Sequence, residues 1–150
     1  MNEIYYTYNN EAIASCIMLE TLSQTQTIDI ARTCLLLPFL LDDKTVNYFR
    51  TANLDHLSLE SLLATKPHLF TSFNKRFLAL LPITINSLMI LSKSNRIDIS
   101  ANISLKQNIL SNNIEIGNRF NEIKKVLPVL LKMIEKHDTT KLYQLLNIQL

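Results

Sequence analysis

A single glycine, Gly117, occurs among the 150 residues of this chain. Glycines allow the tight turns of phosphate-binding loops and the close approach of the backbone to a phosphate, and Walker A loops and dinucleotide-binding fingerprints each contain more than one. The chain can therefore form neither loop, and we expect it to hold no cofactor. Any ATP-driven step in which this protein takes part must be performed by another chain.

The composition predicts one folded domain with a large core. Hydrophobic residues make up 47% of the chain and charged residues only 19%, and the charged fraction is below the average for globular proteins. A domain of this length can bury roughly 70% of the surface of its unfolded chain. We expect one domain over residues 1–150. Because few charges remain to coat a free surface, the composition also favours an apolar surface that a permanent partner covers.

The net charge disfavours a stand-alone nucleic-acid binder, and the cysteines and the N-terminal sequence predict a cytoplasmic protein. The net charge of +2 lacks the strongly basic balance of a stand-alone nucleic-acid binder. Cys16 and Cys34 lie within apolar helical patterns, so we expect two buried free thiols and a reducing compartment. The N-terminus has neither the basic start nor the apolar stretch of a signal peptide. The charge-free stretch 77–92 is shorter than the roughly 20 residues that a membrane span needs.

Hydrophobic periodicity predicts a mainly α fold, a compact helical domain with one short β-strand pair near residues 96–107. The strand pair is expected because Ile97, Ile99, Ile103 and Leu105 alternate with polar residues. Residues 1–9 are expected to be extended, and residues 42–56 to be irregular or to contain a short helix. Helices are expected at residues 12–22, 28–41, 59–65, 69–93, 113–136 and 139–147.

Several local signals refine this prediction. Asn9 or Asn10, Thr27, Ser58, and Thr139 or Thr140 are expected to cap helices. Pro38 and Pro82 fall inside apolar helical patterns, where a proline kinks or breaks the helix. Residues 35–41 are apolar nearly all round, which indicates a central helix packed on several sides. The order helix, strand, long helix, short helix in the C-terminal half resembles a degenerate winged helix, although helix–strand packing without DNA contact also explains it.

The sequence contains no convincing metal or catalytic motif. A zinc site needs about four convergent ligands in recognisable pairs, and the three histidines share no such spacing with the cysteines. A cysteine nucleophile with a distant histidine is conceivable, but a buried thiol is inert. The adjacent Asp42 and Asp43 are explained by a solvated helix end. We therefore expect a protein that is not an enzyme and holds no metal. The histidines are His56, His68 and His137.

A basic stripe is the one candidate contact site. Lys125, Lys132 and Lys136 are separated by 7 and 4 residues, so on a helix they fall within about 40° of one another. They lie opposite the apolar face that runs from Phe120 to Ile134. Such a stripe can follow a nucleic-acid backbone or an acidic partner. The alternative is a solvated helix face with cations near its C-terminal end.

Four blocks of the sequence resemble a known family, the middle component of three-component ABC systems, which are bacterial defence modules of the Lamassu type. Each block alone is a short, mostly apolar motif, and their order along nearly the whole chain is what makes the resemblance. This chain departs from the family by having Asn147 in place of a glycine near the end, and asparagine tolerates the left-handed conformation well. The blocks are Tyr8-Asn9-Asn10-Glu11-Ala12, Leu35-Leu36-Leu37-Pro38-Phe39-Leu40-Leu41, Phe77-Leu78-Ala79-Leu80-Leu81-Pro82 leading to Leu88, and Thr139 to Leu146.

The resemblance implies a function that composition alone does not. It implies a non-catalytic adaptor in an anti-phage or anti-plasmid defence complex, which docks on an SMC/Rad50-like ABC ATPase and couples it to an effector such as a nuclease. DNA would then be reached through the complex, in a hetero-oligomer without membrane contact. Two alternatives stay open, a small helical DNA-binding regulator and a hydrolase with a hidden cysteine or aspartate site.

Overall fold

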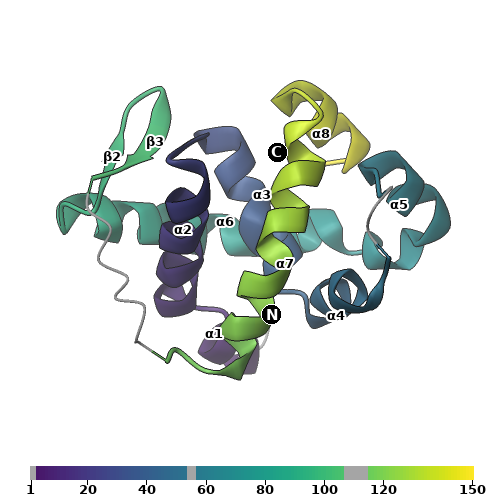
Figure 1. Ribbon diagram of the computed structural model, residues 1–150, viewed down its shortest axis with the longest axis horizontal. Coiled ribbons are helices and arrows are strands. Elements are labelled where there is room, and N and C mark those ends of the chain that lie inside the picture. The colour runs from purple at the N-terminus through teal and green to yellow at the C-terminus, as the bar shows by residue number, and fades with distance from the viewer. Residues whose placement is uncertain (1–2, 54–56, 107–114) are drawn as a thin grey trace.

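The computed structural model describes residues 3–53, 57–106 and 115–150. Helices make up most of these residues, and three short strands form a small antiparallel sheet (Figure 1). The prediction of a mainly α fold with a short strand pair is confirmed. In chain order the elements are α1 (Glu3–Tyr8), α2 (Glu11–Thr25), β1 (Thr27–Asp29), α3 (Ile30–Leu40), α4 (Asp43–Thr51), α5 (Leu59–Thr65), the 3-10 turn η1 (Pro67–Leu69), α6 (Phe73–Lys93), β2 (Ile97–Ile99), β3 (Asn102–Leu105), α7 (Asn118–Glu135) and α8 (Thr139–Leu145).

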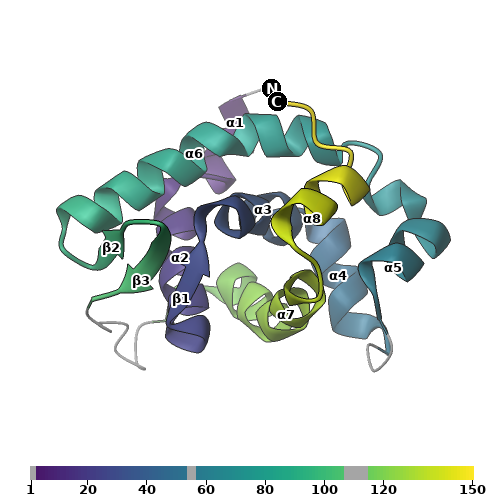
Figure 2. The same ribbon diagram turned by 90° about the horizontal axis from the view of Figure 1, so that it is seen from above.

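Helix α3 lies at the centre of the molecule. Figure 2 shows it between α6, which runs along one side of the molecule, and α7 on the other. Helix α2 packs beside it and contacts both α6 and α7. Leu35, Leu36, Leu37 and Leu40 are completely buried, because this helix has neighbours on several sides. The expectation of a central, apolar helix at residues 35–41 is confirmed.

The sheet joins the two halves of the chain. Strands β2 and β3 form the predicted pair, but the strand order is β1-β3-β2. In the additional antiparallel pairing, Ile28 lies opposite Ile103. Residues Thr27–Asp29 therefore form a strand, and the helix begins only at Ile30. Asp29 rather than Thr27 caps α3, because its side chain accepts from the Arg32 N–H at 2.8 Å.

The C-terminal half is not a separate winged-helix unit, since its strand β3 pairs with β1 from the N-terminal half. In a winged helix the wing follows the recognition helix. Here the strand pair precedes α7, and the described residues after α7 form only α8 and an irregular end. Of the two interpretations of the C-terminal half that the sequence allowed, helix–strand packing therefore describes the arrangement and the winged helix does not.

One expectation for the N-terminal third is wrong, since residues 3–8, expected to be extended, form the short helix α1. The short helix that was one of the two expectations for residues 42–56 is present as α4, at residues 43–51. Asp42 stabilises the start of α4, because its side chain accepts from the backbone N–H and the hydroxyl of Thr45 at 3.1 and 2.6 Å. Of the other expected helix caps, those at Asn10 and Ser58 are confirmed. The last helix, α8, is capped by Asp138 and not by Thr139 or Thr140.

Prolines inside the helices do not break them. Pro82 lies in the middle of α6, which continues from Phe73 to Lys93 as one helix (Figure 2). Pro82 and Leu78 both lie on the exposed side, so solvent can satisfy the carbonyl that the proline leaves without a donor. Pro38 stands near the C-terminal end of α3, so only the last residues of the helix follow it, and it costs the one hydrogen bond that its N–H would have made to the Cys34 carbonyl.

Residues other than glycine take the left-handed conformation at the helix ends. Helices often end at a residue in the left-handed conformation, usually glycine. Here Gln26, Asn95 and Asn147 take positive φ angles of 63°, 59° and 52°. After α8 the Asn147 N–H donates to the Gln144 carbonyl and the Ile148 N–H to the Tyr143 carbonyl, which is the Schellman pattern. The expectation that Asn147 can replace a glycine in this turn is confirmed, and Gly117 itself precedes α7 with φ 113°.

Candidate interaction surface

Three arginines use their side chains to bind carbonyl groups at helix ends. Arg119 donates to the Tyr8 carbonyl at 2.7 Å and to the Leu41 carbonyl at 3.3 Å. Arg76 donates to the Pro38 carbonyl at 3.2 Å and to the Leu69 carbonyl at 3.1 Å. The last carbonyls of a helix lack partners within the helix and carry its negative dipole end. These two guanidinium groups therefore serve the fold.

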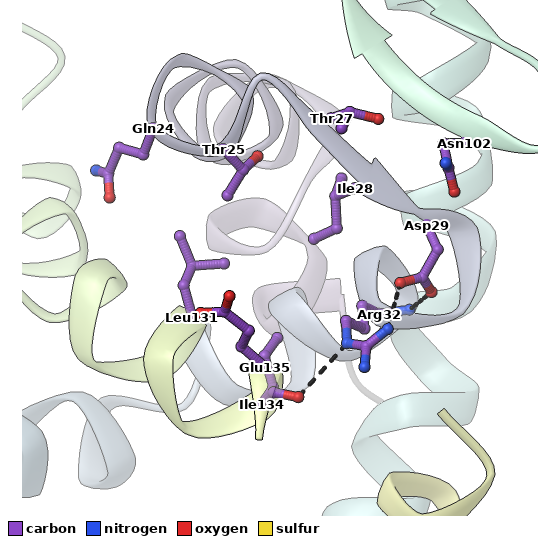
Figure 3. A pocket seen from close by; sticks show the side chains of 10 residues that line it. All are labelled: Gln24, Thr25, Thr27, Ile28, Asp29, Arg32, Asn102, Leu131, Ile134 and Glu135. Carbon is purple, nitrogen blue, oxygen red and sulfur yellow. Dashed lines mark hydrogen bonds and ion pairs between the residues drawn. The ribbon is translucent and has the colours of Figure 1, made fainter. Parts of the chain in front are cut away.

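The third arginine lies in an open cleft of about 560 Å³ beside α7. Figure 3 shows that Arg32 lies between Asp29 and the C-terminal end of α7. It pairs with Asp29 at 2.6 Å and donates to the carbonyls of Ile134 and His137. Every charged group of the cleft except Glu135 is thus engaged in holding α3 to α7. The cleft is explained by structure, and we assign it no ligand.

The residues that the sequence offered as catalytic or metal-binding candidates either make structural contacts or lie away from one another. Asp42 caps α4, and Asp43 lies 3.4 Å from Arg119. His137 contacts Glu60 at 3.1 Å, and His68 belongs to η1. Within residues 3–53, 57–106 and 115–150 no group of three or more His, Cys, Asp or Glu side chains could hold a metal ion. His56 lies outside the described residues.

The two cysteines are half-buried, not fully buried as the sequence pattern predicted. Both thiols stay free, and burial raises the pKa of each above its ordinary value. At Cys34 the nearby Asp29 carboxylate adds to this effect. A raised pKa keeps a thiol protonated at neutral pH, and a protonated thiol is a poor nucleophile.

The basic stripe lies on the exposed side of α7. Lys125, Lys132 and Lys136 are all exposed, and the core face of the helix lies opposite. Lys125 is paired with Glu122 at 3.0 Å, and Glu122 also pairs with Arg50 at 2.6 Å. In the part of the chain that the structure describes, neither Lys132 nor Lys136 forms an ion pair. The two lysines nearest the C-terminal end of α7 are the ones available to an acidic group.

Helix α6 exposes a row of large apolar side chains that sequence reasoning missed. Leu78, Ile85, Met89 and Ile90 are 45–51% exposed, and Pro82 lies among them. We call Leu78, Pro82, Ile85, Met89 and Ile90 the α6 apolar face. The opposite side of the same helix packs on α2 and α3. Residues 77–91 are largely apolar on both sides of the predicted helix. This pattern could have predicted the exposed face.

An apolar pocket of about 700 Å³ adjoins this face. Phe77 and Leu81 of α6 line it, together with Ile30 and Cys34 of α3 and Tyr143 of α8. The Tyr143 hydroxyl donates to the Ala31 carbonyl at 2.8 Å, so the polar atom of this ring already has a partner. The pocket thus presents mainly hydrocarbon to whatever enters it.

Comparison with known proteins identifies the chain. Residues 2–150 match the family model of the ABC-three component (ABC-3C) system Middle Component 3. The chain belongs to this family. The resemblance to middle components of three-component ABC systems is therefore confirmed, and the middle component is part of a multi-subunit system. No curated protein and no solved structure matches the chain.

The four blocks that carried the resemblance meet in the structure of this middle component. Arg119 joins the first block to the second by binding Tyr8 and Leu41. The third and fourth blocks meet where the rings of Phe77 and Tyr143 lie 5.7 Å apart, edge to face. The blocks therefore describe how this fold is held together. The α6 apolar face lies partly within them and continues beyond them to Ile90.

The segment Pro67–Lys93, which contains α6, is long and apolar enough to cross a membrane by length and composition alone. The sequence-based expectation that this region is too short is wrong by that measure. The buried core helix of a soluble protein passes the same test. The packing on α2 and α3 covers one side of α6, and the α6 apolar face lies on its exposed side.

Proposed function

We propose that this middle component is a non-catalytic adaptor, which docks on an SMC/Rad50-like ABC ATPase and couples it to an effector such as a nuclease. The observation that carries the proposal is the family match over residues 2–150. A middle component belongs by definition to a system with other components, one of which is of the ABC type. A chain with a single glycine has no phosphate-binding loop of its own, so ATP hydrolysis falls to that other component.

The surface of the chain supports an adaptor role. Arg32, Arg76 and Arg119 are engaged with helix ends, while four large apolar side chains of α6 face outward. Apolar surface of this kind marks protein–protein contact sites. The same proposal extends to an anti-phage or anti-plasmid defence system of the Lamassu type, which follows from the resemblance. It also extends to a cytoplasmic location, which follows from the cysteines and the N-terminal sequence.

Assembly is the direct test. We expect the chain, co-expressed with the ABC-type component and the effector encoded beside it, to elute with the ABC-type component as one complex in size-exclusion chromatography. A stable contact of this kind buries on the order of 1,000 Å² or more, so the complex should survive dilution to micromolar concentration. Separate elution of this chain at that concentration would contradict the adaptor role.

The basic stripe allows a separate prediction about DNA. Changing Lys132 and Lys136 to glutamate is expected to leave stability within about 0.5 kcal/mol, because both side chains are exposed. DNA binding by the assembled complex is expected to weaken, and the log–log salt dependence to flatten by about one unit per lost phosphate contact. Fluorescence anisotropy of labelled DNA at several salt concentrations measures both quantities.

Lys125→Glu is the matched control for this pair. Lys125 shares the stripe but is already paired with Glu122, so its reversal should change the salt dependence less. Equal DNA affinity and equal slope for the double variant and the unchanged complex would show that the stripe is only a solvated face. Salt-sensitive DNA binding by the isolated chain would instead favour the alternative function, a small DNA-binding regulator.

A further inference from the structure

We propose, on the basis of the adaptor role above, that the α6 apolar face is the docking site for one helix of another component of the system. The occupant is an amphipathic helix whose apolar stripe has acidic residues at both ends. Three features of α6 lead to this assignment: the spacing of its exposed apolar residues, the pocket beside them, and the placement of its charges.

The spacing of the exposed residues favours a helix as the occupant. Leu78, Pro82, Ile85 and Met89 follow one another at intervals of 4, 3 and 4 residues. Alternation of 3 and 4 is the spacing of a coiled-coil seam, in which side chains of one helix insert between side chains of the other. Because this stripe runs along the exposed side of a 21-residue helix, a second helix can follow it over several turns.

The apolar pocket gives the docking site a second, deeper part. Leu81 lines the pocket and is three residues from Leu78 and four from Ile85, so the three side chains adjoin on the helix surface. A large apolar side chain of the occupant can enter the pocket and contact α3 and α8. A specific interface needs about 800 Å² per partner, and the pocket adds area that a single helical stripe lacks. Buried anchors of this kind dominate interface energetics.

The charges of α6 select the chemistry of the occupant. Helix α6 contains Lys75 and Lys93 near its two ends and no aspartate or glutamate. Eighteen residues separate these two lysines, which is five helical turns, so both project from the same side of the helix about 27 Å apart. Both are exposed, and neither forms an ion pair with any residue that the structure describes. Acidic groups at the two ends of a partner helix would complement them.

The same charges disfavour a second copy of this chain. If two α6 helices packed antiparallel about a two-fold axis, Lys75 of one copy would meet Lys93 of the other. If they packed parallel, each lysine would meet its own counterpart. Either arrangement sets like charges against each other without an acidic group on the helix to compensate them, and such contacts between like charges oppose association. The occupant is therefore a different chain.

Paired variants of the co-expressed complex test the proposal. Ile85→Glu combined with Met89→Glu is expected to weaken binding of this chain to its partner component at least about 30-fold, as loss of a central interface anchor does. Ala12→Glu combined with Asn121→Glu is the control, since both positions are exposed on other helices. Circular dichroism and thermal unfolding of the isolated chains check that each variant folds. If the α6 variant binds as tightly as the unchanged chain, the site is elsewhere.

A charge reversal and a cross-link test the chemistry of the occupant. Lys75→Glu with Lys93→Glu is expected to weaken binding and to reduce its salt dependence. A photoreactive residue at position 85 is expected to cross-link to a segment of the partner component with 3–4 apolar spacing and acidic residues about 18 positions apart. A cross-link to a segment without acidic residues, or unchanged affinity and salt dependence after charge reversal, would overturn this choice of occupant.

Other occupants give distinct results. A dimer of the isolated chain in light scattering that Ile85→Glu dissociates would show a second copy on the face. Binding to vesicles of phosphatidylserine and phosphatidylcholine that the same change abolishes would show a membrane. Each of these results would overturn the proposal. A failure of the unchanged chain to bind any component would refute the adaptor role itself, whereas normal binding by the α6 variant would refute only the assignment of this face.

Discussion

Replacement of Leu36 by alanine is expected to lower the free energy of unfolding by about 2–5 kcal/mol, the range for removing a fully buried leucine side chain. Leu36 is completely buried in the central helix α3. Together with Met18 and Leu22 of α2, Leu88 of α6 and Ile103 of β3, it borders a small space at the centre of the fold. Because side chains from several elements meet there, the surrounding structure cannot close the cavity by moving one of them.

Urea unfolding followed by circular dichroism measures this loss. Leu36→Met is the matched control, since it keeps the volume of the side chain and is expected to cost less than about 1.5 kcal/mol. An alanine variant as stable as the unchanged chain would mean that α3 is not the central core element. A native stability of 5–15 kcal/mol is usual for a domain, so the alanine variant should also show reduced yield of the assembled complex.

Replacement of Arg76 by methionine is expected to lower the free energy of unfolding by about 2–3 kcal/mol, because hydrogen bonds to charged groups contribute about 1.5–3 kcal/mol. The Arg76 side chain is only 11% exposed. It donates to the carbonyls of Pro38 and Leu69, and burial lowers the pKa of its guanidinium from the ordinary value. Methionine keeps the length of the side chain and leaves both carbonyls without this donor.

Comparison with Arg76→Lys separates charge from geometry. Lysine keeps the positive charge near Asp42, which lies 3.9 Å from the arginine, but it lacks the planar fork that reaches two carbonyls at once. We expect its stability to fall between those of the methionine variant and the unchanged chain. Equal stability of all three chains in urea unfolding would show that the helix ends do not depend on Arg76.

The scarcity of glycine explains why such arginines matter. Glycine closes many helices by adopting a left-handed conformation that satisfies the last carbonyls. In this middle component asparagine or glutamine takes that conformation at Gln26, Asn95 and Asn147. Elsewhere Arg32, Arg76 and Arg119 reach helix ends from distant parts of the chain. Loss of one of these arginines therefore affects two elements at once.

Local pattern was enough to determine several parts of this protein. The run at residues 35–41 has no polar face, so wherever this helix lies it must be surrounded. The alternation at Ile97, Ile99, Ile103 and Leu105 has a period of two, which only a strand places on one side. Asn147 could be assigned a left-handed turn from the chemistry of its side chain alone. Each of these features depends on residues that are neighbours in the sequence.

Tertiary contacts decided the rest. The three residues of β1 have no strand pattern of their own and become a strand because Ile28 pairs with Ile103. The short helix α1 is too short to be stable alone, and Arg119 binds the carbonyl at its end. Between Leu78 and Ile90 the outward side of α6 is largely apolar, as its buried side is, so the positions of α2 and α3 decide which of these apolar residues remain exposed. Sequence periodicity reports that a side chain is apolar, whereas the neighbours that cover it come from distant parts of the chain.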